Sequence, residues 1–507
     1  MSAAPYSRER VKRGLAYFFF GKGTAALLGL LNFTLIVRLL AVPEYAAYVS
    51  IIAAMELALA FSTFGLDWAG LRYLPEVREL GGGAALRRIA VRLCLYRAAS
   101  LAAAALAGLL ALPLLADASH GQALIPVAHF YLGVLITEGM LRFVAGVIFD
   151  SLLMQAYGQA ALLTRNACFA AALWFAAPGT GLAGIARFEL ASSCAGAALA
   201  VTLLFLFLRT RDAAGPAGGA APALPSGARM RKMALHNYLS MLLNQPYSPQ
   251  ALLLMASLFL SPAQTAVLGF ARNLTELIRR YQPVEMLLGL LRPILISTYA
   301  RARDFAELAR LSRLIYKLSL LTLCPVLIAC TAYGDVLIAQ LAQEKYASAY
   351  ALVAGLAWTL LLRSHRLLAG TMANILDQPQ LLTRTALATL VVLPVCAAGF
   401  SLGHGALTLF AAACVEEVIG TWIIVRGIRG LGHDYAPPWS AMARMAAICA
   451  GASGLLFLAR SWHPSVPWLA LQLALALVCA IGLALASGYL DRSERSMLLG
   501  AAGPGAR

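Results

Sequence analysis

Residues 15–42 read LAYFFFGKGTAALLGLLNFTLIVRLLAV, an apolar stretch that carries Lys22 near its start and Arg38 near its end. A helix rises about 1.5 Å per residue and the hydrocarbon core of a bilayer is about 30 Å thick, so about 20 such residues span a membrane. The stretch is too long for the apolar region of a signal peptide and lacks a clear cleavage site. We therefore expect it to remain as a first transmembrane helix.

The composition of the whole chain supports a membrane protein. The 507 residues are 61% hydrophobic and only 12% charged, with a mean hydropathy of +0.76. Soluble domains carry about 25% charged residues. The formal net charge is +17. In a membrane protein the basic residues are first assigned to loops on one side of the membrane, so we expect no nucleic-acid partner.

The same length criterion predicts an all-α integral membrane protein with about 14 transmembrane helices. The predicted spans are 15–42, 46–66, 89–115, 122–149, 159–178, 182–208, 233–260, 263–298, 310–333, 347–374, 381–402, 405–428, 439–461 and 466–490. The span 263–298 is overlong and contains Pro283, so we expect a kink there.

The loops assign an orientation to these spans. Loops on the side of both termini hold about 22 Lys and Arg residues, whereas the other side clearly holds only Lys345 and Arg460. The positive-inside rule therefore places both termini in the cytoplasm. We expect a multi-pass protein of the bacterial inner membrane.

The chain divides into two related halves. A Gly-, Ala- and Pro-rich linker follows the sixth span, and the turns at 39–46 and 259–266 are similar. We expect two pseudo-symmetric six-helix lobes, related by an axis along the membrane normal, plus two C-terminal helices. The predicted domains are an N-terminal lobe at 1–208, a cytoplasmic linker at 209–232, a C-terminal lobe at 233–428, and two further helices with a tail at 429–507.

Charged residues occur inside several spans, where each costs about 2.5–3.5 kcal/mol unless it faces protein or water. They are Lys22, Glu56, Glu138, Arg142, Arg272, Glu276, Arg279, Arg280, Arg363 and Arg366. We interpret them as a polar, net cationic pathway through the membrane. Arginine suits such a pathway because its planar guanidinium binds phosphate oxygens in pairs.

Structural roles remain open for the same residues. Arg363 and Arg366 can snorkel to the interface, and Glu138 with Arg142 has the spacing of an intrahelical ion pair. Arg272, Glu276 and Arg280 share one helix face, which favours a cavity lining over a salt-bridge network between lobes. Glu416 and Glu417 are adjacent, so we expect at most one of them to face a cavity.

Energy coupling is a separate question. The sequence contains no nucleotide-binding motif, so we expect no cofactor, and a proton or sodium gradient is the candidate energy source. Glu276, Glu138 and Glu56 are the candidate coupling carboxylates, with a purely structural ion-pair role as the alternative for each. The nine Cys show no spacing typical of a metal site or a disulfide framework.

Several short motifs point to a family. They are Arg38-Leu39-Leu40, Glu44-Tyr45-Ala46-Ala47-Tyr48, Phe64-Gly65-Leu66-Asp67, Arg72-Tyr73-Leu74-Pro75-Glu76, Asn237-Tyr238 and the turn at 261–270. In these motifs the chain resembles the polysaccharide transporter (Wzx-type) flippases of the multidrug/oligosaccharidyl-lipid/polysaccharide (MOP) superfamily. It departs from their pattern at Ala41 and Ala46, where Gly is usual.

The resemblance implies a substrate and a mechanism. The substrate would be an oligosaccharide on undecaprenyl pyrophosphate, flipped to the outer leaflet by alternating access for O-antigen, capsule or exopolysaccharide synthesis. We expect Arg272, Arg279, Arg280, Arg363, Arg366, Lys22 and Arg142 to bind its pyrophosphate and glycan in a cationic central cavity.

The expected partners are the lipid-linked oligosaccharide, membrane lipid, a polysaccharide polymerase and chain-length proteins, with the chain acting as a monomer. We expect a transporter and not an enzyme. The alternatives are an ion-coupled small-molecule antiporter of the same fold and a membrane polysaccharide polymerase, against which the short outer loops argue. No specific match to the lipid II flippase is found among the motifs.

Overall fold

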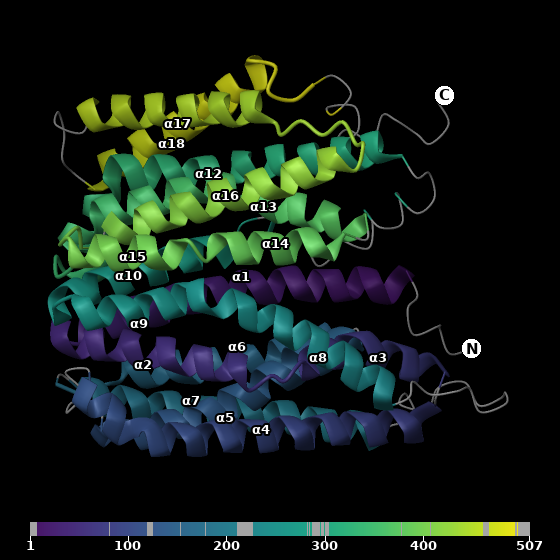
Figure 1. Cartoon of the computed structure of the whole chain (residues 1–507). Coiled ribbons are helices and arrows are strands. Elements are labelled where there is room, and N and C mark those ends of the chain that lie inside the picture. Colours follow the sequence, from purple (N-terminus) through teal and green to yellow (C-terminus); the bar gives the residue numbers. More distant parts are fainter. Residues whose placement is uncertain are drawn as a thin grey trace. The chain divides into compact units, whose positions relative to one another are not determined.

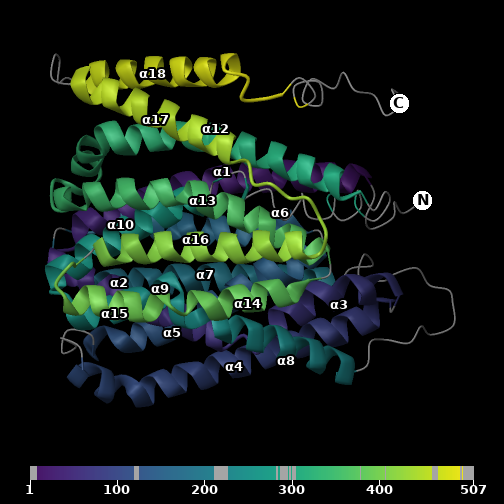
Figure 2. The same cartoon turned by 45° about the horizontal axis from the view of Figure 1, so that its top comes forward.

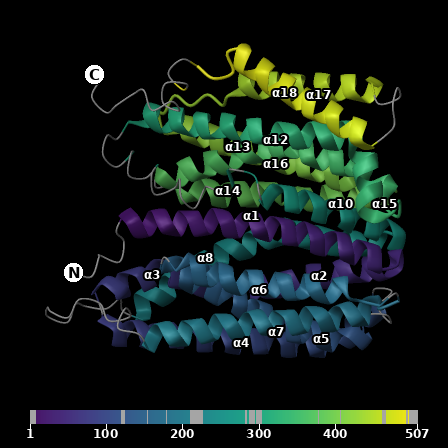
Figure 3. The ribbon, with the colours of Figure 1, turned by 180° about the vertical axis from the view of Figure 1, so that it is seen from behind.

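A computed structural model gives the arrangement of the helices (Figure 1). It describes residues 8–80, 82–118, 125–152, 154–177, 179–209, 227–280, 282, 284–285, 295, 299, 304–376, 378–405, 407–459, 466–491 and 494. Within these ranges the regular structure is entirely helical. Within each of the two compact units defined below, the long helices lie side by side (Figures 1 and 3).

The described elements follow the chain in a simple order. They are α1 (Arg8–Leu39), α2 (Val42–Phe61), α3 (Leu66–Leu80), α4 (Gly82–Ala118), α5 (Ile125–Phe143), η2 (Val144–Phe149), α6 (Gln155–Trp174), α7 (Gly181–Arg209), α8 (Gly227–Asn244), η4 (Gln245–Tyr247), α9 (Pro249–Phe259), α10 (Pro262–Arg280), α12 (Phe305–Ala342), η5 (Ala347–Ala349), α13 (Tyr350–Ile375), α14 (Pro379–Thr389), α15 (Val392–Ser401), α16 (Leu407–Gly430), α17 (Trp439–Ala459) and α18 (Val466–Ala486).

The helices confirm an all-α, multi-pass membrane fold. Among the described residues, 9 helices are long and apolar enough to cross a membrane, and the apolar segments Gly23–Leu39 and Leu471–Ala484 add two shorter ones. The three remaining predicted spans correspond to α6, to α8 with α9, and to α10. These are less apolar or interrupted, because α10 carries several charges and η4 breaks α8 from α9 at Pro246.

Some predicted boundaries were wrong. Residues 66–80 were expected to lie largely in a loop, but they form α3, a helix too short to span a bilayer. Its buried side chains Ala69, Tyr73, Leu74 and Val77 occupy one face, which packs on α4. Within the span predicted at 263–298, the described helix α10 ends at Arg280. The expected kink at Pro283 falls on a residue outside the described ranges.

The chain forms two compact units, Met1–Ala266 and Val267–Arg507. In the first unit α5 packs against α4 and α7, and α7 also packs against α6. In the second unit α13 packs in the same way against α12 and α16, and α16 also packs against α14 and α15. This repeated packing is the pseudo-symmetry that the sequence predicted. The predicted domain boundaries themselves stay a prediction, since most of the linker lies outside the described residues.

Each unit has its own apolar core residues. In the first unit a core is built from α3, α4, α5, η2, α6 and α7, with Phe149 and Leu141 fully buried. In the second unit one core joins α12 and α13 to α17 and α18, which Figure 2 shows beside α12, and another joins α12 and α13 to α14 and α16. Residues after α18 return to α12, where Lys317 Nζ donates to Glu494 Oε2 at 2.8 Å and the Tyr489 hydroxyl donates to the Lys317 carbonyl at 3.1 Å.

Motif residues that are far apart in the sequence meet in the first unit. Gly65 has φ = +73°, and a Cβ there would collide with the carbonyl oxygen of Ala234 on α8, so only glycine fits this turn. The ring of Phe64 lies 5.2 Å from that of Tyr238, whose hydroxyl donates to the Phe61 carbonyl at 2.8 Å. These residues therefore join the end of α2 to α8.

The two turns that looked alike in the sequence share one capping device. Glu44 is the third residue of α2, and its Oε2 accepts from the Ala41 N–H at 3.2 Å. Gln264 is the third residue of α10, and its Oε1 accepts from the Ser261 N–H at 3.2 Å. Glu44 Oε1 also accepts from the Leu182 N–H at 3.3 Å, so one carboxylate serves the first turns of α2 and α7.

We expect Glu44→Ala to lower the free energy of unfolding by at least about 1 kcal/mol, because it removes a helix cap and an inter-helix contact. Glu44→Gln keeps an acceptor and should cost less. Thermal unfolding in detergent measures both, with Gln264→Ala as the matched change in the second turn. An unchanged melting temperature for Glu44→Ala would contradict this role.

Candidate functional site

A cluster of ionised side chains lies in the second unit, on α10, α13, α16 and the residues just after α10. Arg279 on α10 donates from Nε to Glu276 Oε2 at 2.7 Å and from Nη1 to Glu285 Oε1 at 2.8 Å. Arg363 on α13 lies 3.7 Å from Glu285 and 3.3 Å from Glu417 on α16. Glu285 and Glu417 therefore connect the three helices through two arginines.

Arg366 completes this cluster one turn along α13. Its Nη2 lies 2.6 Å from Glu416 Oε1, and its Nε lies 2.6 Å from Glu417 Oε2. The side chain can cross α16 because residue 420 is glycine, where a Cβ would lie 2.7 Å from Arg366 Cδ. Although Glu416 and Glu417 are adjacent on α16, one long guanidinium reaches both carboxylates, and the expectation that at most one of them faces a cavity stays a prediction.

We call these eight residues the second-unit cluster. They are Glu276, Arg279, Arg280, Glu285, Arg363, Arg366, Glu416 and Glu417. The sequence predicted a net cationic lining, whereas the cluster balances its arginines with carboxylates. Its depth is graded, because the side chain of Glu417 is 3% exposed and those of Arg363 and Arg280 are 29% and 57% exposed. Glu276 and Glu285 are 22% and 24% exposed, so the more exposed side of the cluster carries both arginines and carboxylates, with Arg280 the most exposed.

A smaller cluster of the same kind lies in the first unit, on α5, α6 and α7. Arg165 Nε lies 3.2 Å from Glu138 Oε2, and Arg165 Nη2 lies 3.0 Å from Glu189 Oε1. Arg142 Nε also pairs with Glu138, at 3.0 Å, and the Ser193 hydroxyl donates to Glu138 Oε2 at 3.3 Å. We call Glu138, Arg142, Arg165 and Glu189 the first-unit cluster.

The two clusters share one packing feature and differ in another. In both, a glycine of the sixth span of a half lies beneath an arginine: Gly196 on α7 faces Arg165, and Gly420 on α16 faces Arg366. In the first unit Arg165 belongs to α6, the fifth span, and pairs with carboxylates on α5 and α7. In the second unit the arginines belong to α13, the fourth span, and pair directly with α16.

Seven of the predicted site residues lie in the two clusters, and three lie outside them. Glu138 and Arg142 belong to the first-unit cluster, and Glu276, Arg279, Arg280, Arg363 and Arg366 belong to the second. Three others lie elsewhere. Lys22 is on α1 with its side chain outside the described residues, Arg272 is half-buried on α10, and Glu56 accepts from Gln250 Nε2 at 2.5 Å.

Sequence reasoning missed Arg165, Glu189 and Glu285. The signal for the first two was available, because both lie inside apolar helices and the cost of a charge at that depth applies to them as well. Glu285 follows α10 near Pro283, where no helical register could be assigned from the sequence. Among the described residues, no group of metal-ligating side chains is close enough to hold a metal ion.

We expect Arg165→Gln to lower the free energy of unfolding by about 3–5 kcal/mol, since it leaves buried Glu138 and Glu189 without their shared cation. The double variant Arg165→Gln/Glu189→Gln should recover part of this loss. Thermal unfolding in detergent and yield in membranes measure both effects.

Arg142→Gln is the matched control, because the Arg142 side chain is 46% exposed and Glu138 keeps Arg165. We expect it to cost less than about 1 kcal/mol. If Arg142→Gln and Arg165→Gln lowered the free energy of unfolding equally, the buried arginine shared by Glu138 and Glu189 would contribute no more than an exposed one.

Comparison with solved structures identifies the fold. The chain superimposes on the lipid II flippase MurJ in an inward closed conformation, with a TM-score of 0.60 at 11% identity over 96% of this chain and 99% of that one. It also matches the MATE multidrug transporter DinF-BH, with a TM-score of 0.58 at 13% identity over 84% and 96%. An inward-facing MATE family transporter of the MOP superfamily gives 0.56 at 14% identity over 81% and 96%.

No protein-family model and no curated protein sequence matches the chain. At identities this low, the structural likeness establishes the fold. The chain therefore has the helical fold shared by MurJ and these MATE transporters.

Proposed function

We propose that this protein is a membrane transporter and that it flips undecaprenyl-pyrophosphate-linked oligosaccharide across the bacterial inner membrane. The observation that carries the proposal is the second-unit cluster, in which α10 and α13 bring four arginines together, and Arg280 and Arg363 among them are partly exposed. The sequence motifs that resemble Wzx-type flippases supply the substrate class.

The carboxylates of the cluster neutralise its arginines when no substrate is bound. An arginine in the membrane is expensive without a counter-charge, and the four carboxylates supply one. A guanidinium has five N–H donors, so an arriving pyrophosphate can take donors from Arg279, Arg363 or Arg280 while the buried Glu417 stays paired. Arg272, Lys22 and Arg142 are the remaining proposed contacts to the pyrophosphate and glycan.

An ion-coupled small-molecule antiporter is the second candidate. The observation that favours it is the number of buried carboxylates, since the side chains of Glu138, Glu189 and Glu417 are 7%, 5% and 3% exposed. Carboxylates inside a membrane protein suit proton or sodium coupling and the recognition of cations. A polysaccharide polymerase receives no such support.

The remaining expectations belong to this proposal. The protein would act as a monomer, with both termini in the cytoplasm and the polysaccharide polymerase and chain-length proteins as partners. Its energy would come from a proton or sodium gradient, with Glu276, Glu138 and Glu56 as the candidate coupling residues.

The triple variant Arg272→Ala/Arg279→Ala/Arg280→Ala should lower the rate of oligosaccharide flipping at least about tenfold, since one charged hydrogen bond is worth about 1.5–3 kcal/mol. The measurement uses proteoliposomes that contain lipid-linked oligosaccharide, with outer-leaflet glycan detected by an impermeant lectin or glycosidase. Arg384→Gln is the control, because Arg384 is an exposed arginine of the same unit outside the cluster.

Two outcomes of this assay would reject the proposal. Wild-type flipping by the triple variant would remove the site assignment. Absence of glycan flipping by the unmodified protein, together with gradient-driven export of a cationic dye, would establish the antiporter instead.

Glu276→Gln tests the coupling role of its carboxylate. If Glu276 binds the coupling ion, the variant should transport at a rate that no longer responds to an imposed proton or sodium gradient. Glu307→Gln at the start of α12 is the matched control, since Glu307 pairs only loosely with Arg310 at 4.0 Å outside the cluster. An unchanged gradient response in Glu276→Gln would exclude this residue from coupling.

A further inference from the structure

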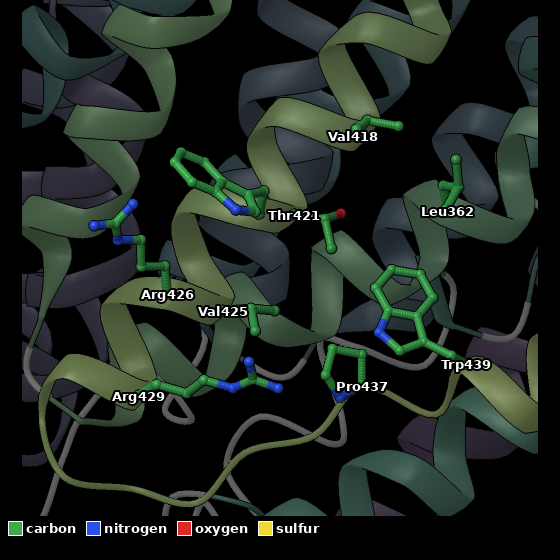
Figure 4. Close-up of a pocket in the computed structure, with 9 residues that line it drawn as sticks. Leu362, Val418, Thr421, Val425, Arg426, Arg429, Pro437 and Trp439 are labelled. Atoms are coloured by element: carbon green, nitrogen blue, oxygen red, sulfur yellow. The ribbon is translucent and has the colours of Figure 1, made fainter.

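A cavity of about 500 Å³ lies in the second unit, and none of its lining residues belongs to the second-unit cluster. Its walls come from α13, α16, the loop after α16 and the start of α17 (Figure 4). The residues that line it are Leu362, Val418, Thr421, Trp422, Val425, Arg426, Arg429, Pro437 and Trp439. Its volume is in the range of small-molecule sites, which is about 300–1,000 Å³.

The lining changes from apolar to basic along one face of α16. Val418, Trp422 and Val425 are followed by Arg429 at spacings that place all four on the same side of the helix. The distance from residue 418 to residue 429 is about 16 Å at 1.5 Å per residue. Half of a hydrocarbon core of about 30 Å has nearly this length. The groove therefore matches one leaflet in depth.

The basic end of the groove lies where α16 ends, on the side that the positive-inside rule assigns to the cytoplasm. Figure 4 shows Arg429 and Pro437 at one end, with Val418 at the other. Two tryptophans, Trp422 and Trp439, line the groove, and tryptophan concentrates at the level of lipid headgroups. Charge and aromatic residues thus place this end at the membrane–water interface.

The two arginines at this end differ from those of the second-unit cluster. Among the described residues, no carboxylate lies within 4.0 Å of Arg426 or Arg429. Arg426 instead lies over the Trp422 ring, 5.2 Å from its centroid, and Arg429 Nε donates to the Tyr435 carbonyl at 2.8 Å. Both guanidinium groups therefore have neutral partners among the described residues.

The loop that closes the groove is anchored from behind. The Tyr435 hydroxyl is hydrogen-bonded to His365 Nε2 at 2.9 Å, and the His365 ring packs 5.9 Å from that of Trp439. His365 and Tyr435 are both buried. The loop and the start of α17 are therefore fixed against α13, so the groove is a formed site.

Its apolar wall faces outward. Val418, Trp422 and Trp439 are 55%, 59% and 49% exposed, which in a membrane protein means contact with acyl chains. A ligand of this site must therefore bring an acyl chain for the wall and an anion for the two arginines. We propose that the groove binds an anionic glycerophospholipid of the bilayer, with its phosphate on Arg426 and Arg429 and an acyl chain along Val418, Trp422 and Val425.

Quenching of tryptophan fluorescence by brominated lipid tests this site, because two tryptophans line it. The probes are dibromo-phosphatidylglycerol and dibromo-phosphatidylcholine with the same acyl chains, titrated into the purified full-length protein in neutral detergent. Half-maximal quenching should need about thirtyfold less phosphatidylglycerol, since two basic residues near an anionic headgroup together favour its binding by about that factor. Trp422→Phe/Trp439→Phe should lose the high-affinity part of the quenching.

The double variant Arg426→Gln/Arg429→Gln should lose the preference for phosphatidylglycerol, and Arg426→Lys/Arg429→Lys should keep most of it. Arg384→Gln is the matched control, since it removes an exposed arginine from α14 outside the groove. Size-exclusion profile and helical circular dichroism establish that each variant is folded.

Several outcomes would overturn the proposal. Equal affinity for the two lipids, or a preference that survives in the Gln double variant, would remove the headgroup assignment. If Arg384→Gln also lost the preference for phosphatidylglycerol, the preference would arise from general surface charge and not from this groove. Displacement by glycerol 3-phosphate would assign the site to a free phosphate, and displacement by polyprenyl phosphate at lower concentration than phosphatidylglycerol would assign it to a carrier lipid.

Discussion

An ionised side chain inside a membrane protein needs a counter-charge close by, and this requirement organises both units. Glu138 and Glu189 share Arg165 in the first unit, and Glu417 holds Arg363 and Arg366 in the second. Removing one partner of such a buried pair costs about 3–5 kcal/mol, more than most apolar contacts contribute. The clusters therefore favour the packing of α5, α6 and α7 in the first unit and of α10, α13 and α16 in the second.

The same requirement separates two kinds of basic residue. The arginines of the second-unit cluster, on α10 and α13, have carboxylate partners. Arg426 and Arg429 have an aromatic ring and a carbonyl as neighbours, and they lie where α16 ends. Charge inside the bundle is balanced by the protein itself, whereas charge at its edge is left for the surroundings to balance.

Much of the fold could be predicted from the sequence because hydropathy and length decide whether a helix can span a bilayer. The similar turns at 39–46 and 259–266 also proved to share one capping arrangement, at Glu44 and Gln264. The helix α3 was missed because it is amphipathic and short, so its burial depends on α4 and not on its mean hydropathy. The break at Gln245–Tyr247 depends on Pro246, a single residue within an otherwise apolar run.

The candidate site was predictable only in part. Charges inside spans identified Glu138, Arg142, Glu276 and the arginines of α10 and α13, because their cost depends on position along one helix. Pairs within one helix follow from spacing, as Glu138 with Arg142 does, but which carboxylate an arginine meets on another helix depends on how the helices pack. The cationic lining expected from a tally of arginines became a balanced cluster once Glu285, Glu416 and Glu417 were placed beside them.

The pairing of Lys317 with Glu494 has a consequence for biosynthesis. The two residues are 177 positions apart, and at about 5–20 residues per second a ribosome needs about 10–35 s to make that stretch. During this time α12 has to enter the membrane before its counter-ion exists. Lys317 lies in the first half of α12, so its ammonium can extend toward the headgroups until Glu494 has been synthesised. Once Glu494 has been synthesised, it can pair with Lys317 and fix the position of α12.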